Sequence, residues 1–196
     1  MADRLAGKVA IVTGAGSSGE GLGNGKAAAI LFGREGASVL CVDNRVERAE
    51  ETAAIIAGEG GIASVFEADV SRQQGCRAMV AAAVERYGKV DILQNNVGVS
   101  SDQSLEEVTE EGWDRIMAVN VRSMVLAAQA AAPPMAAQGG GSIITLSSIA
   151  GLRAYPARMT AYTTSKAAIV GLTIALAGQL GSRRIRVNAI APGQVY

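Results

Sequence analysis

Tyr162 and Lys166 have side chains and a spacing that suit proton transfer. Side chains four residues apart in a helix are neighbours on one face, and the apolar pattern around this pair predicts a helix over Ala161–Leu180. A phenol is almost fully protonated near neutral pH, but an adjacent ammonium group favours the phenolate. The pair is therefore a candidate general acid/base, although Tyr-x-x-x-Lys spacing also arises often by chance on a protein surface.

An asparagine and a serine could complete such a site. Asn120 is the one amide on an otherwise apolar face of the predicted helix Glu110–Ala132, and a buried amide needs hydrogen-bond partners or a task. Ser148 follows the predicted strand Ser142–Leu146, and doubly wound sheets place ligands at the carboxyl ends of their strands. A hydroxyl there could hold a substrate oxygen. The alternatives are a serine that caps a turn and an asparagine that caps neighbouring backbone.

A glycine-rich loop lies between the first predicted strand, Val9–Thr13, and the first predicted helix, Gly25–Arg34. This is the context of a dinucleotide fingerprint, because glycine lets a pyrophosphate approach the backbone and the helix N-terminus supplies free N–H donors. A flexible surface loop is the alternative. A Walker-type phosphate loop fits poorly, because Lys26 is followed by Ala27 rather than by Ser or Thr.

Asp43 follows the second predicted strand, Ser38–Val42. A carboxylate at this position can accept hydrogen bonds from the adenosine ribose hydroxyls and repel a 2′-phosphate, which predicts a preference for NAD over NADP. Arg45 could offset that charge, and a solvated strand-end carboxylate is the alternative. The glycine loop and Asp43 together favour the dinucleotide interpretation.

Short apolar segments alternate with longer helical ones along the chain. Several of the short segments are apolar on consecutive residues, which is typical of parallel strands covered on both faces. The sequence therefore predicts an α/β protein with a Rossmann-type doubly wound parallel sheet in three αβα layers, and one domain over residues 1–196. The predicted strands are Val9–Thr13, Ser38–Val42, Ser64–Glu67, Ile92–Gln94, Ser142–Leu146 and Val187–Ile190, and the helices are Gly25–Arg34, Arg45–Ala57, Arg72–Tyr87, Glu110–Ala132 and Ala161–Leu180.

Composition excludes several other functions. Basic and acidic residues balance at 18 each, so no polybasic surface indicates nucleic acid or an anionic membrane. The chain has no histidine, which excludes Ser-His-Asp and Cys-His catalysis and removes the main nitrogen ligand of zinc, so we expect no metal. The apolar runs fall short of a membrane span. The residues before the first strand do not resemble a secretory signal, and Cys41 and Cys76 suit a reducing compartment, which predicts a cytoplasmic protein.

Five motifs in order along the chain resemble those of the classical short-chain dehydrogenase/reductase family. The first four are the glycine loop, the pair Asp69-Val70, the segment Asn95–Gly98 and the set Asn120, Ser148, Tyr162 and Lys166, which matches the family's catalytic tetrad. The fifth is Asn188 through Gly193, which resembles the sixth strand and its turn. The loop departs from the compact family form by five extra residues between Gly14 and Gly23.

The resemblance implies that Tyr162 is the general acid/base, that Lys166 favours its ionised form and holds the nicotinamide ribose, and that Ser148 orients the substrate oxygen. Asn120 would bend its helix and anchor a water in the proton relay. The residues expected to bind the cofactor are Gly14, Ser17, Gly23, Asn24, Gly25, Asp43, Asp69, Val70, Asn96, Gly98, Tyr162, Lys166, Pro192, Gly193 and Val195.

We therefore expect an oxidoreductase that transfers a hydride between NAD, preferred, or NADP and a secondary alcohol or ketone. The alternative is a non-catalytic or truncated dinucleotide-binding protein. The chain ends at Tyr196, where the family continues with a substrate lid and a seventh strand, so we expect a C-terminally incomplete domain that is a poor catalyst. Helices Glu110–Ala132 and Ala161–Leu180 are apolar on more than one face, which predicts a homodimer or homotetramer.

Overall fold

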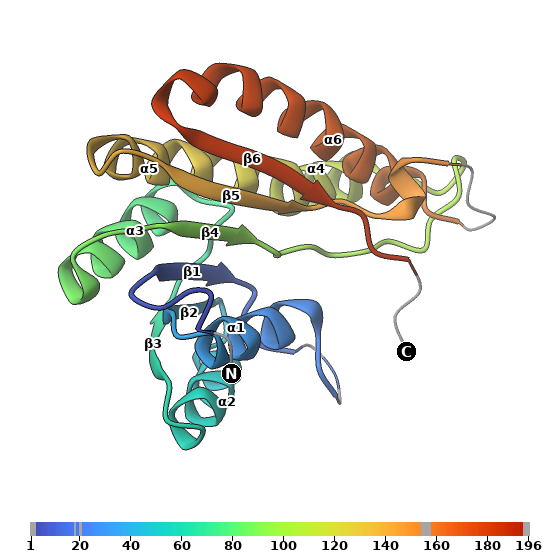
Figure 1. Ribbon diagram of the computed structural model, residues 1–196. Helices are drawn as coiled ribbons and strands as arrows, with labels where there is room; N and C mark the ends of the chain where they lie inside the picture. The colour runs from blue at the N-terminus through green and yellow to red at the C-terminus, as the bar shows by residue number, and fades with distance from the viewer. Residues whose placement is uncertain (1–2, 18, 20, 154–157, 194–196) are drawn as a thin grey trace.

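Strand β1 (Val9–Thr13) is buried at every residue, as its unbroken apolar sequence predicts for a parallel strand covered on both faces. The computed structural model, which describes residues 3–17, 19, 21–153 and 158–193, places β1 inside a six-stranded sheet (Figure 1). Every pairing is parallel, and the order is β3-β2-β1-β4-β5-β6. The other strands are β2 (Ser38–Asp43), β3 (Ile62–Glu67), β4 (Ile92–Asn95), β5 (Gly141–Leu146) and β6 (Ile185–Ile190).

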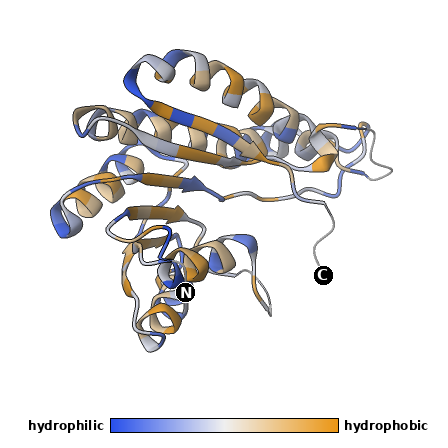
Figure 2. Cartoon of the chain, viewed as in Figure 1, coloured by the Kyte–Doolittle hydropathy of each residue, from blue (hydrophilic) through white to orange (hydrophobic). Residues whose placement is uncertain are grey.

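Helices cover both faces of the sheet, which confirms the predicted three-layer Rossmann-type fold. Helices α1 and α2 pack on one face, while α3, α5 and α6 pack on the other. Apolar residues concentrate along the strands and on the helix faces that meet them (Figure 2). The helices are α1 (Asn24–Arg34), α2 (Val46–Gly58), α3 (Gln73–Tyr87), α4 (Glu110–Met117), α5 (Ser123–Ala137) and α6 (Thr160–Leu180).

Strands β3 and β6 each begin two residues earlier than the sequence pattern predicts, at Ile62 and Ile185. The reason is pairing with the neighbouring strand, because Ile62 pairs with Ser38 of β2 and Ile185 pairs with Gly141 of β5. Strand length is thus set by the partner strand as well as by the local pattern.

The long helical segment does not stop at Ala132, as predicted, but continues through Pro133 and Pro134 as α5 to Ala137. Proline removes an N–H donor from a helix, which usually ends it. Here Pro133 is exposed, whereas Met135 is fully buried in the core against the sheet. Burial of the apolar side chains beyond the prolines offsets the lost hydrogen bonds.

Between α4 and α5 the same segment contains a π turn, Ala118–Arg122, with Asn120 at its centre. The continuous helical segment Glu110–Ala137 is the one in the described residues that is long and apolar enough to cross a membrane by length and composition alone. Its inner face, including Ala127, Ala128 and Ala131, is buried in the core that α3 and the sheet share. These contacts are those of a core helix.

Candidate active site

A cavity of about 780 Å³ lies along the carboxyl ends of the strands, where sheets of this type place their ligands. Asn120 is buried and does not line this cavity, and the predicted residue Val195 lies outside the described residues. The other residues predicted from sequence come together there: Gly14, Ser17, Gly23, Asn24, Gly25, Asp43, Asp69, Val70, Asn96, Gly98, Ser148, Tyr162, Lys166, Pro192 and Gly193.

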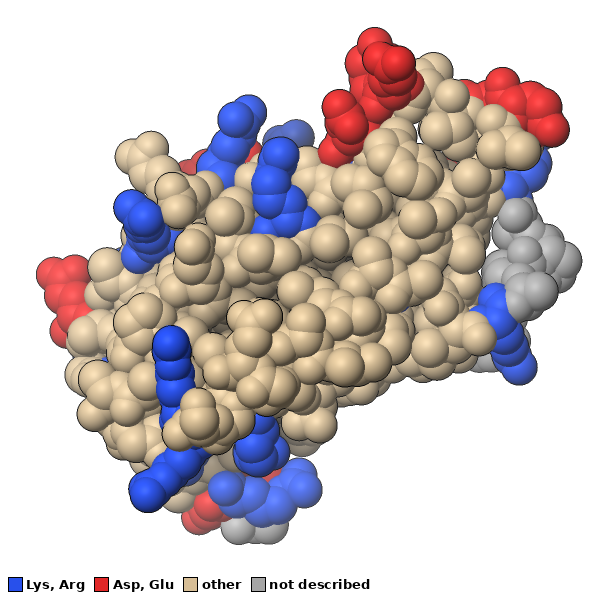
Figure 3. Space-filling view, turned by 90° about the horizontal axis from the view of Figure 1, so that it is seen from above, with Lys and Arg blue, Asp and Glu red and all other residues tan. Residues whose placement is uncertain are grey.

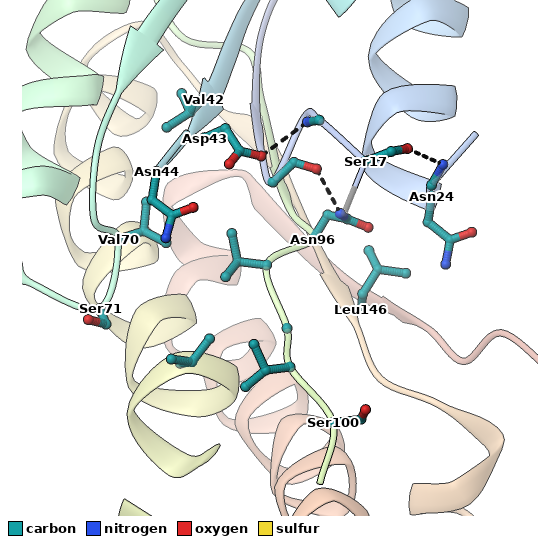
Figure 4. A pocket seen from close by; sticks show the side chains of 18 of the residues that line it. Ser17, Asn24, Val42, Asp43, Asn44, Val70, Ser71, Asn96, Ser100 and Leu146 are labelled. Atoms are coloured by element: carbon teal, nitrogen blue, oxygen red, sulfur yellow. Dashed lines mark hydrogen bonds between the residues drawn. The ribbon is translucent and has the colours of Figure 1, made fainter. Parts of the chain in front are cut away.

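The glycine loop is packed so tightly that side chains are excluded at its turn. A Cβ atom on Gly25 would lie 1.9 Å from the carbonyl oxygen of Gly14 and 2.4 Å from Nδ2 of Asn96. Gly14 itself has φ of +62°, in the left-handed region that favours glycine. The Asn96 amide donates to the Gly14 carbonyl at 3.1 Å (Figure 4). The loop after β4 therefore fixes the glycine turn after β1.

Ser17 closes the longer part of this loop. Its Oγ accepts a hydrogen bond from the N–H of Gly23 at 2.7 Å (Figure 4), and it donates to the carbonyl of Gly21 at 3.0 Å. Gly23 then caps α1 without a side-chain hydrogen bond, and the first turn of α1 carries no acidic residue. The N-terminus of α1 therefore presents free N–H groups and the positive end of its dipole to the cavity, which suits an anion such as pyrophosphate.

Asp43 ends β2 with its carboxylate held by two backbone amides. Oδ2 accepts from the N–H of Gly16 at 3.2 Å (Figure 4), and Oδ1 accepts from the N–H of Arg45 at 3.1 Å. The Arg48 side chain, rather than that of Arg45, lines the cavity here. A Cβ atom on Gly16 would lie 2.3 Å from Cβ of Arg48, so only glycine allows this close packing.

Asp69 and Val70 form the far wall of the cavity, after β3. The Asp69 carboxylate accepts from both the N–H and the hydroxyl of Ser71, at 2.9 and 2.6 Å, which shapes the turn into α3. A Cβ atom on Gly75 would lie 2.4 Å from the Asp69 carbonyl oxygen. Gly75, which carries no motif, thus permits α3 to pack directly on this wall.

The Asn120 amide is almost fully engaged by protein. Its Oδ1 accepts from the N–H of Val99 at 2.8 Å, and its Nδ2 donates to the Val99 carbonyl and to Oγ of Ser165, both at 2.9 Å. Both amide hydrogens are used in this way, so a water could be held only by Oδ1 or by the backbone carbonyl of Asn120. If Asn120 anchors a water, as the resemblance implies, it can do so only by accepting a hydrogen bond from that water.

Tyr162 and Lys166 face each other on the first turns of α6, as their spacing predicts. The ammonium nitrogen of Lys166 lies 5.5 Å from the centre of the Tyr162 ring and donates to the carbonyl of Leu146 at 2.8 Å. Lys166 is only 5% exposed, and this burial lowers its pKa to about 8. At neutral pH Lys166 is therefore still mostly in its ammonium form.

Two consecutive serines at the end of β5 have different tasks. Ser147 donates to the carbonyl of Lys166 at 2.7 Å, so it anchors the helix that carries the lysine. Ser148 lines the cavity, and its Oγ accepts from the N–H of Ala150 at 3.2 Å. Ser148 can therefore cap this turn and also bind a ligand, because its hydroxyl hydrogen has no protein acceptor among the described residues.

Several residues in and around this site were not predicted from the sequence. Arg48 lies one turn into the helix after Asp43, and this position in the sequence is a signal that could have found it. Ser147 and Ser165 each stand directly before a predicted site residue, but short polar residues in such places are too common to be informative. Arg115 of α4 and Val119, which directly precedes Asn120 in the π turn, also line the cavity.

Replacing Lys166 by Met is expected to remove a pH dependence of folding stability. The pKa of Lys166 is about 8 in the folded protein, and that of lysine is about 10.4 in an unfolded chain. Between these values the unfolded chain binds more protons, so rising pH stabilises the wild type. The unfolding free energy of the wild type, measured relative to that of Lys166→Met, should rise by on the order of 3 kcal/mol between about pH 7 and about pH 11.

Denaturant titrations of both proteins across this range measure the difference. The comparison is needed because burial raises the pKa of Cys41 to about 12 and that of Cys76 to about 11, and both thiols destabilise the protein as the pH rises. Both proteins contain these thiols, so the contributions of the thiols cancel in the difference between the two unfolding free energies. Curves that stay parallel would contradict the lowered pKa of Lys166.

The chain matches the family model described as short chain dehydrogenase over residues 8–196. It is 44% identical over 186 residues to the "Probable galactose dehydrogenase GalD" of Rhizobium meliloti (strain 1021), covering 94% of this chain and 70% of that protein. The crystal structure of a short-chain type dehydrogenase/reductase from Mycobacterium marinum superposes with a TM-score of 0.93 at 37% identity, over 98% of this chain and 76% of the other.

A 7α-hydroxysteroid dehydrogenase, solved with NADH and 7-oxo glycochenodeoxycholic acid, gives a TM-score of 0.91 at 38% identity. The superposition covers 98% of this chain and 72% of that one. These matches extend from the glycine loop to the turn after β6, and so they include both sides of the cavity.

Proposed function

This chain belongs to the short-chain dehydrogenase/reductase family, and from that premise we propose that it transfers a hydride between NAD and a secondary alcohol or ketone. It is an oxidoreductase, as are the relatives whose names state an activity. The observation that carries the proposal is that one cavity joins the glycine loop and the N-terminus of α1 to Ser148, Tyr162 and Lys166. We call this loop, from Gly14 to Gly25, the glycine cradle. We further propose that residues 1–196 form one cofactor-binding and catalytic domain.

The cradle supports a bound dinucleotide. The space that a Cβ atom on Gly25 would fill is closed by backbone, and the adjacent N-terminus of α1 has free N–H groups for the pyrophosphate. Asp43 would hold the adenosine ribose, Asp69 and Val70 the adenine, and Lys166 the nicotinamide ribose. When bound, the nicotinamide supplies the carbon that gives or takes the hydride.

The protein's own part is to position the substrate and move a proton. Ser148 accepts from the Ala150 N–H, which leaves its hydroxyl hydrogen for the substrate oxygen. Tyr162 would give or take the proton at its phenol oxygen, and the Lys166 ammonium would stabilise the phenolate. Because Lys166 is buried, water screens this charge only weakly.

The test is a turnover assay with the purified protein, NAD and a panel of secondary alcohols. The panel includes galactose and a hydroxysteroid, which the names of two relatives suggest. Formation of reduced nicotinamide that depends on both protein and alcohol supports the proposal. Tight NAD binding without turnover across the panel would instead favour a cofactor-binding protein.

NAD is expected to bind at least about tenfold more tightly than NADP, because the Asp43 carboxylate would face the 2′-phosphate. Gly16 and Arg45 hold that carboxylate in place through their backbone N–H groups. The dissociation constants of the two cofactors, measured by titration, give the ratio directly. Asp43→Ser should reduce the preference for NAD over NADP. Arg48→Gln should increase that preference, because it removes a positive charge that could interact with the 2′-phosphate. Tighter binding of NADP to the wild type would refute the assignment.

We propose that the enzyme is a soluble, cytoplasmic homodimer or homotetramer. Helix α6 has no charged residue between Lys166 and its end at Leu180, and Ile174 on its outer face is 69% exposed. Gly171 and Gly178 flank Ile174 one turn away on either side, with open space above them. Viewed from above, the molecule has a broad central area without charged side chains (Figure 3). Such a surface suits a second copy of the chain.

Replacing Ile174 by Glu is therefore expected to lower the molecular mass in solution, because a charge would be buried in the interface. Light scattering after size-exclusion chromatography at micromolar concentration measures the mass. Leu31→Glu is the matched control, since Leu31 is also an exposed apolar residue but lies on α1. A wild type that is monomeric would count against the proposal.

A further inference from the structure

Ser165 lies on α6 between the two residues of the proposed proton transfer, but it does not line the cavity. It is fully buried. Its Oγ accepts from Nδ2 of Asn120 at 2.9 Å and donates to the carbonyl of Tyr162 at 2.7 Å. An amide nitrogen only donates and a carbonyl only accepts, so the direction of both hydrogen bonds is fixed.

These bonds extend a chain that joins three separate segments. The Asn120 side chain also forms hydrogen bonds with both the N–H and the carbonyl of Val99, which follows β4. Through Ser165, the loop after β4 and the π turn are therefore connected to the first turn of α6. That turn is also bonded to the loop after β4 by its backbone, since the Thr160 N–H donates to the Gln103 carbonyl at 3.3 Å, but its N-cap, Met159, makes no side-chain hydrogen bond.

The turn that carries Lys166 is held separately. Ser147 donates to the Lys166 carbonyl, and a Cβ atom on Gly151 would lie 2.5 Å from the Lys166 carbonyl carbon. The positions of Tyr162 and Lys166 thus depend on different anchors. Loss of either anchor would change the distance between the phenol and the ammonium group.

We propose that Ser165 is a positioning residue for the proton transfer, because its hydroxyl ties the backbone of Tyr162 to the amide of Asn120. This inference rests on the proposed function. The attraction between a phenolate and an ammonium group depends on their distance and is strong where water is excluded. By holding Tyr162 in place, Ser165 keeps its phenol where the buried Lys166 acts on it.

Lys166 is the charged group that faces the Tyr162 ring. Arg158, four residues before Tyr162, is paired with Asp102 and Glu107 of the loop after β4. The remaining charged side chains around the cavity are Asp43, Arg48, Asp69 and Arg115, and none of these is hydrogen-bonded to Tyr162 or Lys166 in the described residues.

The test is Ser165→Ala, which removes both hydrogen bonds and keeps a good helix former, so that the protein should fold. We expect kcat to fall by about tenfold with KM changed less than about twofold, as for an interaction felt in the transition state. The pH at which the rate is half-maximal should move upward. Ser165→Cys keeps the size and a weak donor and should recover part of the rate.

Thr173→Val is the matched control. Thr173 lies two turns further along α6, is buried, and donates to the Ile169 carbonyl at 2.7 Å while it pairs with Thr145. Its loss should lower the thermal midpoint but leave kcat and the pH profile unchanged. If Ser165→Ala behaves in the same way, Ser165 is only structural and the proposal is overturned.

Hydrogen–deuterium exchange separates this inference from the proposed function, because it needs no substrate. Exchange of the backbone amides is followed by mass spectrometry in the wild type, in Ser165→Ala and in Thr173→Val. Ser165→Ala should speed exchange in the first turn of α6, which carries Tyr162, more than Thr173→Val does. Unchanged exchange in that turn would overturn the role of Ser165, whereas absence of turnover by the wild type would overturn only the proposed function.

Discussion

Turnover by the Tyr162→Phe protein is expected to fall by about 10³-fold, because the ring keeps its packing while the proton that the reaction exchanges is lost. Cofactor binding should stay within about twofold of the wild type, since the substitution leaves the glycine cradle and Lys166 in place. Steady-state rates and cofactor titrations on the same preparation measure both quantities.

Two further variants make this result specific. Lys166→Ala should damage both turnover and cofactor binding, because the lysine is proposed to serve the phenol and the ribose together. Tyr87→Phe removes a phenol hydroxyl that donates to Oγ of Ser64 at 2.7 Å, away from the cavity, and should keep the wild-type rate. A wild-type rate for Tyr162→Phe would show that the acid/base assignment is wrong.

Gly25→Ala is expected to weaken cofactor binding by at least about tenfold and to lower the unfolding free energy by about 1–3 kcal/mol. The added methyl group would collide with the Gly14 carbonyl and the Asn96 amide, both of which shape the loop. The loop would have to open where the pyrophosphate is proposed to bind. Cofactor titration and denaturant unfolding measure the two effects.

Gly58→Ala is the matched glycine control. Gly58 is the last residue of α2, and a Cβ atom there meets no atom within 4 Å. Alanine is the better helix former, so this variant should be as stable as the wild type or slightly more stable, with unchanged cofactor affinity. If Gly25→Ala bound the cofactor as well as Gly58→Ala does, the glycine cradle would not be the pyrophosphate site.

Local sequence patterns were enough to predict the features that depend on neighbouring residues in the chain. Consecutive apolar residues predicted β1 as a strand covered on both faces, and the alternation of strands and helices predicted the parallel sheet. The spacing of Tyr162 and Lys166 predicted that their side chains face each other on one helix. These inferences succeed because helix and strand periodicities are fixed by the backbone and do not depend on distant residues.

Contacts between these local features could not be predicted in this way, because they depend on the packing of distant segments. The burial that lowers the pKa of Lys166 comes from the segments packed around α6, and the carbonyl that it contacts belongs to Leu146 of β5. Likewise, Ser165 is linked to Asn120 across 45 residues of sequence, and α5 continues through its prolines because Met135 packs in the core. Contacts between residues far apart in the chain leave no periodic pattern in the sequence, so hydrogen-bond partners and electrostatics at this site followed only from packing.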